Sequence, residues 1–150
     1  MKIYADTSIF GGPFDSEFDT PSKEFFKQVK EGRFHLCISD VVRQELKLAP
    51  TEVRNLFDEF LEYSEILPIT NECLELRDLY LSHNILTQKS RDDALHVATA
   101  SIHECDIIIS WNFKHIVHYD KIKLYNTVNT IHGFKEIFIN SPSEVIYYDD

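Results

Sequence analysis

Three acidic residues of this sequence stand where they could share one chemical task. Asp6 directly follows the short apolar segment at residues 3–5. Glu45 comes soon after a second apolar segment, and Asp93 opens a segment whose apolar residues recur at helical spacing. Clustered carboxylates without His or Cys partners are ligands that suit Mg²⁺ or Mn²⁺. Such ions activate water and stabilise the charge on a phosphate, so these residues indicate phosphodiester hydrolysis.

Each acid also has an ordinary explanation. Asp6 could be a turn residue, since aspartate after a strand is common. Glu45 could be a solvated helix residue, and Asp92 and Asp93 could match the dipole of a helix N-terminus. The joint pattern is more informative than any single acid, because three acids scattered along the sequence fall near one predicted sheet edge.

A different chemistry is conceivable for the acid after the first strand. In aspartyl-phosphate phosphatases this carboxylate is the nucleophile, and a second aspartate two residues later is the general acid. Here that position is Ser8. The phosphatase interpretation therefore lacks its acid.

The segments that must position these acids alternate between strand and helix patterns. Strands are predicted at residues 3–5, 34–38, 66–67, 106–110 and 136–139, and helices at 21–30, 39–49, 51–63, 71–84, 91–104 and 121–132. This alternation indicates an α/β sandwich with a mainly parallel sheet. Ligands of such sheets bind beyond the carboxyl ends of the strands. All three acids fall near that edge.

Length and composition predict a single domain spanning residues 1–150, since 43% of the residues are hydrophobic. We find no signal-peptide layout and no segment near the ~18 apolar residues of a membrane span, so we expect a cytoplasmic protein with no membrane partner. Cys37, Cys73 and Cys105 are far apart and form no C-x-x-C motif. We interpret them as small buried hydrophobic residues.

The formal net charge is −10. Taken alone, this charge disfavours a nucleic-acid partner, because phosphates would be repelled. Bound divalent cations would invert the field at a cluster of acids, and a basic partner chain could supply further positive charge. Net charge therefore does not exclude an RNA substrate.

Four segments, taken in order, resemble the motifs of PIN-domain proteins. They are Asp6-Thr7-Ser8, SDVVRQE at 39–45, DALHVATA at 93–100 and ISWNFKH at 109–115. The resemblance covers residues 2–142. It implies a three-layer α/β/α sandwich and a Mg²⁺- or Mn²⁺-dependent ribonuclease. Many small bacterial and archaeal members resemble VapC-like toxins, which implies an antitoxin partner and a homodimer.

The resemblance also assigns roles to individual positions. The family's first three acids fall on Asp6, Glu45 and Asp93, which makes these residues the expected metal ligands. The family has hydroxyl residues after its first acid, where one can bond an acidic ligand or a metal-bound water, and these positions fall on Thr7 and Ser8. The family's Ser or Thr after the central strand falls on Ser110.

The sequence departs from the family at the fourth acid, where it has Asn112. Its amide can orient water but brings no charge, so we expect a second metal to be weak or absent. Asp92 could compensate, although neighbouring helix residues diverge by ~100°. His115 could contact a substrate phosphate or lie in a solvated loop. For His96 a structural role is the simpler expectation.

The sequence thus predicts a metal-dependent endoribonuclease in which Asp6, Glu45 and Asp93 hold Mg²⁺ or Mn²⁺ and Asn112 assists. This enzyme would be the toxin of a type II toxin-antitoxin pair. The alternative is a PIN scaffold with little or no catalysis, acting as an RNA-binding or protein-interaction module. The RNA target and the oligomeric state stay open.

Overall fold

Each strand pairing in the computed structural model, which describes residues 1–149, is parallel. The strands follow the order β3-β2-β1-β4-β5 across one sheet. They are β1 (Lys2–Ala5), β2 (His35–Ser39), β3 (Ser64–Leu67), β4 (Ile107–Ile109) and β5 (Phe138–Asn140). The prediction of an α/β fold with a mainly parallel sheet is confirmed.

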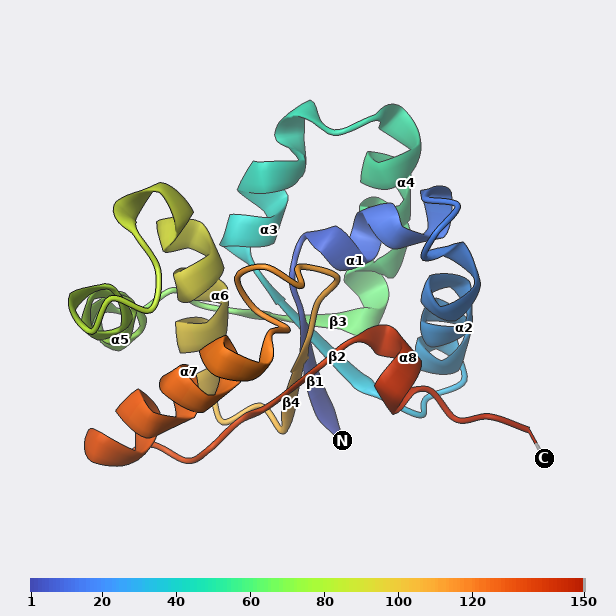
Figure 1. Ribbon diagram of the computed structural model, residues 1–150. Helices are drawn as coiled ribbons and strands as arrows, with labels where there is room; N and C mark the ends of the chain where they lie inside the picture. The colour runs from blue at the N-terminus through green and yellow to red at the C-terminus, as the bar shows by residue number, and fades with distance from the viewer. Residues whose placement is uncertain (150) are drawn as a thin grey trace.

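Helices cover both faces of this sheet, as Figure 1 shows. On one face lie α1 (Ser8–Gly11), α2 (Asp19–Lys30), α4 (Thr51–Phe60) and α8 (Pro142–Val145). On the other face lie α5 (Asn71–Ser82), α6 (Arg91–Ile102) and α7 (Tyr119–Ile131). The expected three-layer α/β/α sandwich is therefore present. None of the helices within residues 1–149 has the length and apolar content that a membrane crossing requires.

The alternation of side chains along each strand divides the core into two clusters. Ile3 and Ala5 of β1 face the layer that contains α2 and α4, whereas Tyr4 faces α5 and α6. A central strand covered on both faces needs apolar residues throughout. Tyr4 is fully buried but carries a hydroxyl, which must find a hydrogen-bonding partner inside the protein.

The register of the sheet sets which residues meet at its carboxyl edge. Ala5 of β1 pairs with Ile109 of β4, so Asp6 and Ser110 follow directly at adjacent positions. Ser39 ends β2 on the other side of β1 and is followed at once by α3 (Asp40–Glu45). One parallel edge therefore collects side chains from three distant parts of the sequence.

Several boundaries differ from those predicted. The helix expected at 39–49 is α-helical only to Glu45 and continues as the 3₁₀-helix η2 (Leu46–Leu48). Residues 61–63, expected to end a helix, form η3 (Leu61–Tyr63). The sequence analysis did not predict α1, α8, η1 (Gly12–Phe14) or η4 (Gln88–Ser90). Elements of three or four residues are too short to show a hydrophobic period.

Candidate active site

Asp6 lies at the centre of the carboxyl edge and is only 4% exposed. Its Oδ1 accepts a hydrogen bond from the Ser8 hydroxyl at 2.6 Å, and its Oδ2 accepts one from the Ser110 hydroxyl at 2.5 Å. The same two hydroxyl oxygens accept hydrogen bonds from the backbone N–H groups of Trp111 and Asn112, each at 2.9 Å. Two serines thus connect the buried carboxylate to the loop after β4.

Glu45 reaches the same edge from the end of α3. Its Oε1 accepts hydrogen bonds from the Thr7 hydroxyl at 2.8 Å and from His96 Nε2 at 2.6 Å. The side chain of Glu45 is 33% exposed, whereas that of His96 is 1% exposed. Both hydrogen bonds fall on one oxygen, which leaves Oε2 as the oxygen available to a ligand.

A chain of hydrogen bonds fixes His96 from behind. The Tyr4 hydroxyl lies 2.7 Å from His96 Nδ1 and 2.7 Å from the Ser39 hydroxyl. Because an ionised carboxylate can only accept, Nε2 carries the hydrogen that bonds Glu45. In the neutral imidazole, Nδ1 then accepts from Tyr4, and Tyr4 accepts from Ser39. This buried chain sets the orientation of the imidazole.

Asp93 lies in the first turn of α6 and is half-buried. Its carboxyl interacts electrostatically with His96, His115 and Glu45, and hydrogen bonding to the Asn112 side chain stabilises its ionised form. The Oδ1 atom of Asn112 accepts hydrogen bonds from the backbone N–H groups of Lys114 at 3.2 Å and His115 at 2.9 Å. Asn112 therefore shapes the loop that lies beside Asp93.

Burial dominates the electrostatics of two of the acids. It raises the pKa of Asp6, and the nearby His96 and the hydroxyls of Ser110 and Ser8 offset this only in part. Burial also raises the pKa of Asp93, again opposed by His96. A cation between the acids would offset the cost of ionising both.

Glu45 and His96 shift in the directions of an ion pair. Burial acts to raise the pKa of Glu45, but the hydrogen bond and charge of His96 and the hydroxyl of Thr7 outweigh it and lower that pKa. Burial acts to lower the pKa of His96, but the hydrogen bond to Glu45 and the charges of Asp6, Glu45 and Asp93 raise it. His96 thus interacts with all three acids.

The donor set of the three acids suits a hard divalent cation, since it contains carboxylate oxygens and no sulfur. Asp6, Glu45 and Asp93 do not form a group whose ligand atoms all lie within 4.8 Å of one another. At least one pair is therefore further apart, and a carboxylate must rotate to share an ion. In the described part of the chain, the group that meets this distance is His35, Cys37 and Glu65, which the sequence analysis did not single out.

The remaining predicted residues lie around this edge with different degrees of contact. Asp92 is exposed in the first turn of α6, where an acid favours the helix N-terminus. His115 Nε2 lies 3.4 Å from the Ser90 hydroxyl, and the His115 carbonyl accepts a hydrogen bond from Tyr125.

Sequence reasoning missed Tyr4 and Ser39 as members of the candidate site and favoured a structural role for His96. A signal was present for two of them. Tyr4 places a hydroxyl in an otherwise apolar central strand, and His96 lies three residues after Asp93, on the same side of α6. The strand order that brings Tyr4 between Ser39 and His96 was needed to connect them.

Comparison with known proteins identifies the fold. No family model and no curated protein sequence matches the chain. A chain of the VapBC2 structure from Rickettsia felis, bound to a DNA fragment from their promoter, matches with a TM-score of 0.59 and 16% identity over 93% of this chain and 98% of that one. The FitAcB structure from Neisseria gonorrhoeae matches with a TM-score of 0.59 and 14% identity, over 95% of this chain and 99% of that one.

A third match is the structure of FitAB bound to the IR36 DNA fragment, with a TM-score of 0.62 and 10% identity over 98% of this chain and 99% of that one. Since the identities are 10–16%, these likenesses define the fold alone. They agree with the fold that the PIN-domain motifs implied. The chain thus has the α/β/α fold of the matched chains in the VapBC2 and FitAB structures.

Proposed function

We propose that this protein is an endoribonuclease that hydrolyses RNA phosphodiester bonds with Mg²⁺ or Mn²⁺. The observation that carries the proposal is that Asp6, Glu45 and Asp93, which come from three segments of the chain, all interact electrostatically with one buried imidazole at the carboxyl edge of the sheet. The fold and the motifs of the sequence support the same assignment.

The carboxylates of Asp6, Glu45 and Asp93 would hold the ion. When bound, the ion supplies a Lewis acid for the scissile phosphate and lowers the pKa of a bound water. Ser8 and Ser110 keep Asp6 oriented, while Thr7 and His96 hold Glu45 Oε1, so that Oε2 would be the oxygen to bind an ion. These fixed hydrogen bonds keep the ligands in place without reorganisation during the reaction.

Asn112 and His115 complete the proposed site on the side of the substrate. Asn112 holds the loop through its Oδ1 and favours the ionised form of Asp93. His115 is half-buried beside this loop, where it could contact a substrate phosphate. The side chain of Asn112 carries no charge, so we propose one tightly bound ion rather than two.

The fold and the sequence motifs also support a toxin that has an antitoxin partner. Solved structures with this fold include the VapBC2 and FitAB structures bound to DNA, and the sequence motifs resemble those of VapC-like toxins. We propose that the chain forms a homodimer in the cytoplasm and binds an antitoxin. A basic partner segment would suit the net charge of −10.

The decisive experiment measures cleavage of a mixed RNA substrate in Mn²⁺ by purified wild-type protein and two variants. Asp6→Asn and Asp93→Asn should each reduce cleavage by roughly 10²–10³-fold or more, the scale of losing one preorganised electrostatic group. Asp120→Asn is the matched control, because Asp120 is an exposed acid in the first turn of α7. Unchanged cleavage in both site variants would refute the assignment.

A second function is favoured by one specific observation. The Asn112 oxygen is engaged by two backbone N–H groups, and the residue brings no negative charge to the fourth acid position. An RNA-binding or protein-interaction module without useful catalysis needs no complete metal site. This alternative predicts RNA that is bound and recovered at full length in saturating Mn²⁺, whereas the nuclease gives shorter fragments.

A further inference from the structure

A second group of metal-ligating side chains lies toward the amino end of β2, away from the candidate active site at its carboxyl end. His35 and Cys37 are two residues apart on β2 and therefore face the same side of the sheet. Glu65 lies directly opposite Cys37 in the register of β2 and β3. Neighbouring strands lie about 4.7–4.9 Å apart, so side chains at paired positions can reach a common ligand.

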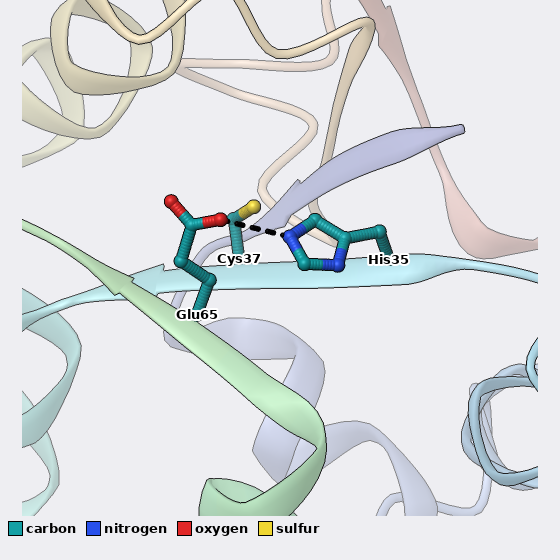
Figure 2. A group of neighbouring side chains, drawn as sticks. All are labelled: His35, Cys37 and Glu65. Atoms are coloured by element: carbon teal, nitrogen blue, oxygen red, sulfur yellow. Dashed lines mark hydrogen bonds and ion pairs between the residues drawn. The ribbon is translucent and has the colours of Figure 1, made fainter.

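The three ligand atoms are already close together. His35 Nε2 lies 2.9 Å from Glu65 Oε1, and these atoms and the Cys37 Sγ all lie within 4.8 Å of one another. Figure 2 shows the three side chains on the same side of the two strands, with the His35-Glu65 contact next to the sulfur of Cys37. Ligands on a tetrahedral zinc ion are about 3–4 Å apart, given bonds of about 2.0–2.3 Å.

Exposure gives an ion access to this group. The side chains of His35 and Glu65 are 53% and 48% exposed, so both can adjust their rotamers, whereas Cys37 is buried beside them. As an ion pair alone, His35 and Glu65 contribute little to stability, because exposed pairs are worth about 0–1 kcal/mol.

We propose that His35, Cys37 and Glu65 form a Zn²⁺ site, completed by a water molecule, that joins the edge strand β3 to β2. A borderline ion accepts nitrogen, sulfur and oxygen together, whereas Mg²⁺ does not select a thiolate. Binding releases the thiol proton, and the thiolate and the carboxylate then balance the charge of the ion.

Positive groups around the site oppose a cation there, among them Lys2 and His103, which both interact electrostatically with Glu65. The Lys2 ammonium interacts electrostatically with Cys37 and Glu65 and donates a hydrogen bond to the His103 carbonyl at 2.8 Å. This cation limits the affinity for a metal without occupying a ligand position. The zinc proposal is independent of the nuclease proposal, because none of its ligands belongs to the carboxyl edge.

Titration with Co²⁺, a spectroscopic substitute for Zn²⁺, tests the site in the full chain with excess Mg²⁺ present. Wild-type protein should bind one equivalent with a near-ultraviolet thiolate-to-cobalt band, and Zn²⁺ should abolish that band. The band should disappear in Cys37→Ser. His35→Gln and Glu65→Gln each remove a direct ligand. Each should weaken binding at least 10- to 100-fold, because the loss of a residue that only hydrogen-bonds to a metal ligand already weakens binding by that factor.

Two matched controls separate this site from the other chemistry of the chain. Cys73→Ser removes another buried thiol, and Asp6→Asn removes the central acid of the candidate active site; both should retain the band. No charge-transfer band in wild-type protein, or a band that persists in Cys37→Ser, overturns the proposal. Should Cys37→Ser fail to fold, unchanged Co²⁺ affinity in both His35→Gln and Glu65→Gln, which alter exposed residues, overturns it equally.

Discussion

Asp6 combines two demands that oppose each other. A carboxylate is a good ligand only when ionised, yet this one is almost fully buried and burial raises its pKa. The hydroxyls of Ser8 and Ser110 reduce that cost without removing it. The ionised side chain should therefore destabilise the metal-free protein at neutral pH.

Replacing Asp6 with asparagine tests this cost directly. Because the pKa of Asp6 is raised in the folded state, the folded protein loses stability as pH rises above the unfolded value of about 3.9. Asp6→Asn should therefore raise Tm by a few degrees at pH 7 without metal. The gain should shrink as pH falls toward and below about 4, where the unfolded acid also becomes protonated.

Calorimetry or circular dichroism with a chelator present measures the effect. Glu75→Gln is the matched control, since Glu75 is an exposed acid on α5, and it should change Tm little at either pH. An Asp6→Asn variant less stable than wild type at pH 7 would contradict the expected cost of ionisation.

His96 and Tyr4 offer a second test at the residue scale. Tyr4 holds His96 Nδ1, and His96 in turn holds Glu45 Oε1. Tyr4→Phe should therefore weaken Mn²⁺ binding by up to about 10-fold, the lower end of the effect of removing outer hydrogen-bonding partners of a metal site. Electron paramagnetic resonance of free Mn²⁺ measures this affinity without any enzymatic assay.

Tyr80→Phe provides the matched control for this variant. Tyr80 is fully buried, and its hydroxyl donates to Asn129 Oδ1 at 2.5 Å, away from the acids. Both variants should lose stability through a missing buried hydrogen bond, roughly 0.5–1.5 kcal/mol each. Equal Mn²⁺ affinity in the two variants would reduce the Tyr4-His96 contact to a structural role.

At the scale of elements, the candidate site depends on how η1 supports the loop after β4. Trp111 Nε1 donates a hydrogen bond to the Ser22 hydroxyl at 2.9 Å, and the Trp111 ring stacks on Phe18 with a centroid distance of 4.3 Å. A Cβ atom on Gly12 would lie 2.1 Å from Ser22 Oγ and 2.8 Å from Trp111 Nε1. Glycine is thus required by close packing.

Gly12→Ala should destabilise the protein by about 1–3 kcal/mol, the cost of overpacking a filled core. At roughly 2–4 °C per kcal/mol for a chain of this size, Tm should fall by about 2–12 °C in a thermal melt. Gly11→Ala is the matched control, because a Cβ on Gly11 meets nothing within 4 Å. Equal Tm values for the two variants would refute the packing argument.

At the scale of the whole molecule, the proposed function together with the net charge of −10 predicts that divalent cations stabilise the folded protein. An ion that binds only the folded state stabilises it by about 2.7 kcal/mol at 100 times its Kd. Mn²⁺ should then raise Tm by roughly 5–11 °C. Asp93→Asn should lose most of this shift, and a wild-type Tm unchanged by Mn²⁺ or Mg²⁺ would favour the binding module over the nuclease.

The sequence by itself determined the class of fold and the acids worth testing. Periodicity reveals strands and helices because it depends on neighbouring residues, so β1, α5 and α6 were predicted closely. Shorter elements such as α1 and α8 were missed, although Pro142 and the Ser141-Glu144 capping box mark the start of α8. The predictions were wrong where an element was too short to show a hydrophobic periodicity.

Tertiary structure alone decided how the candidate site is held together. Asp6 and Ser110 are 104 residues apart, Tyr4 and His96 are 92 apart, and Glu45 and His96 are 51 apart. Such contacts follow from the strand order β3-β2-β1-β4-β5, which no local pattern encodes. The same order places Glu65 opposite Cys37. The sequence supplied the ligand types, whereas strand pairing decided which of them meet, because hydrogen bonds and metal ligation depend on distances of a few ångströms.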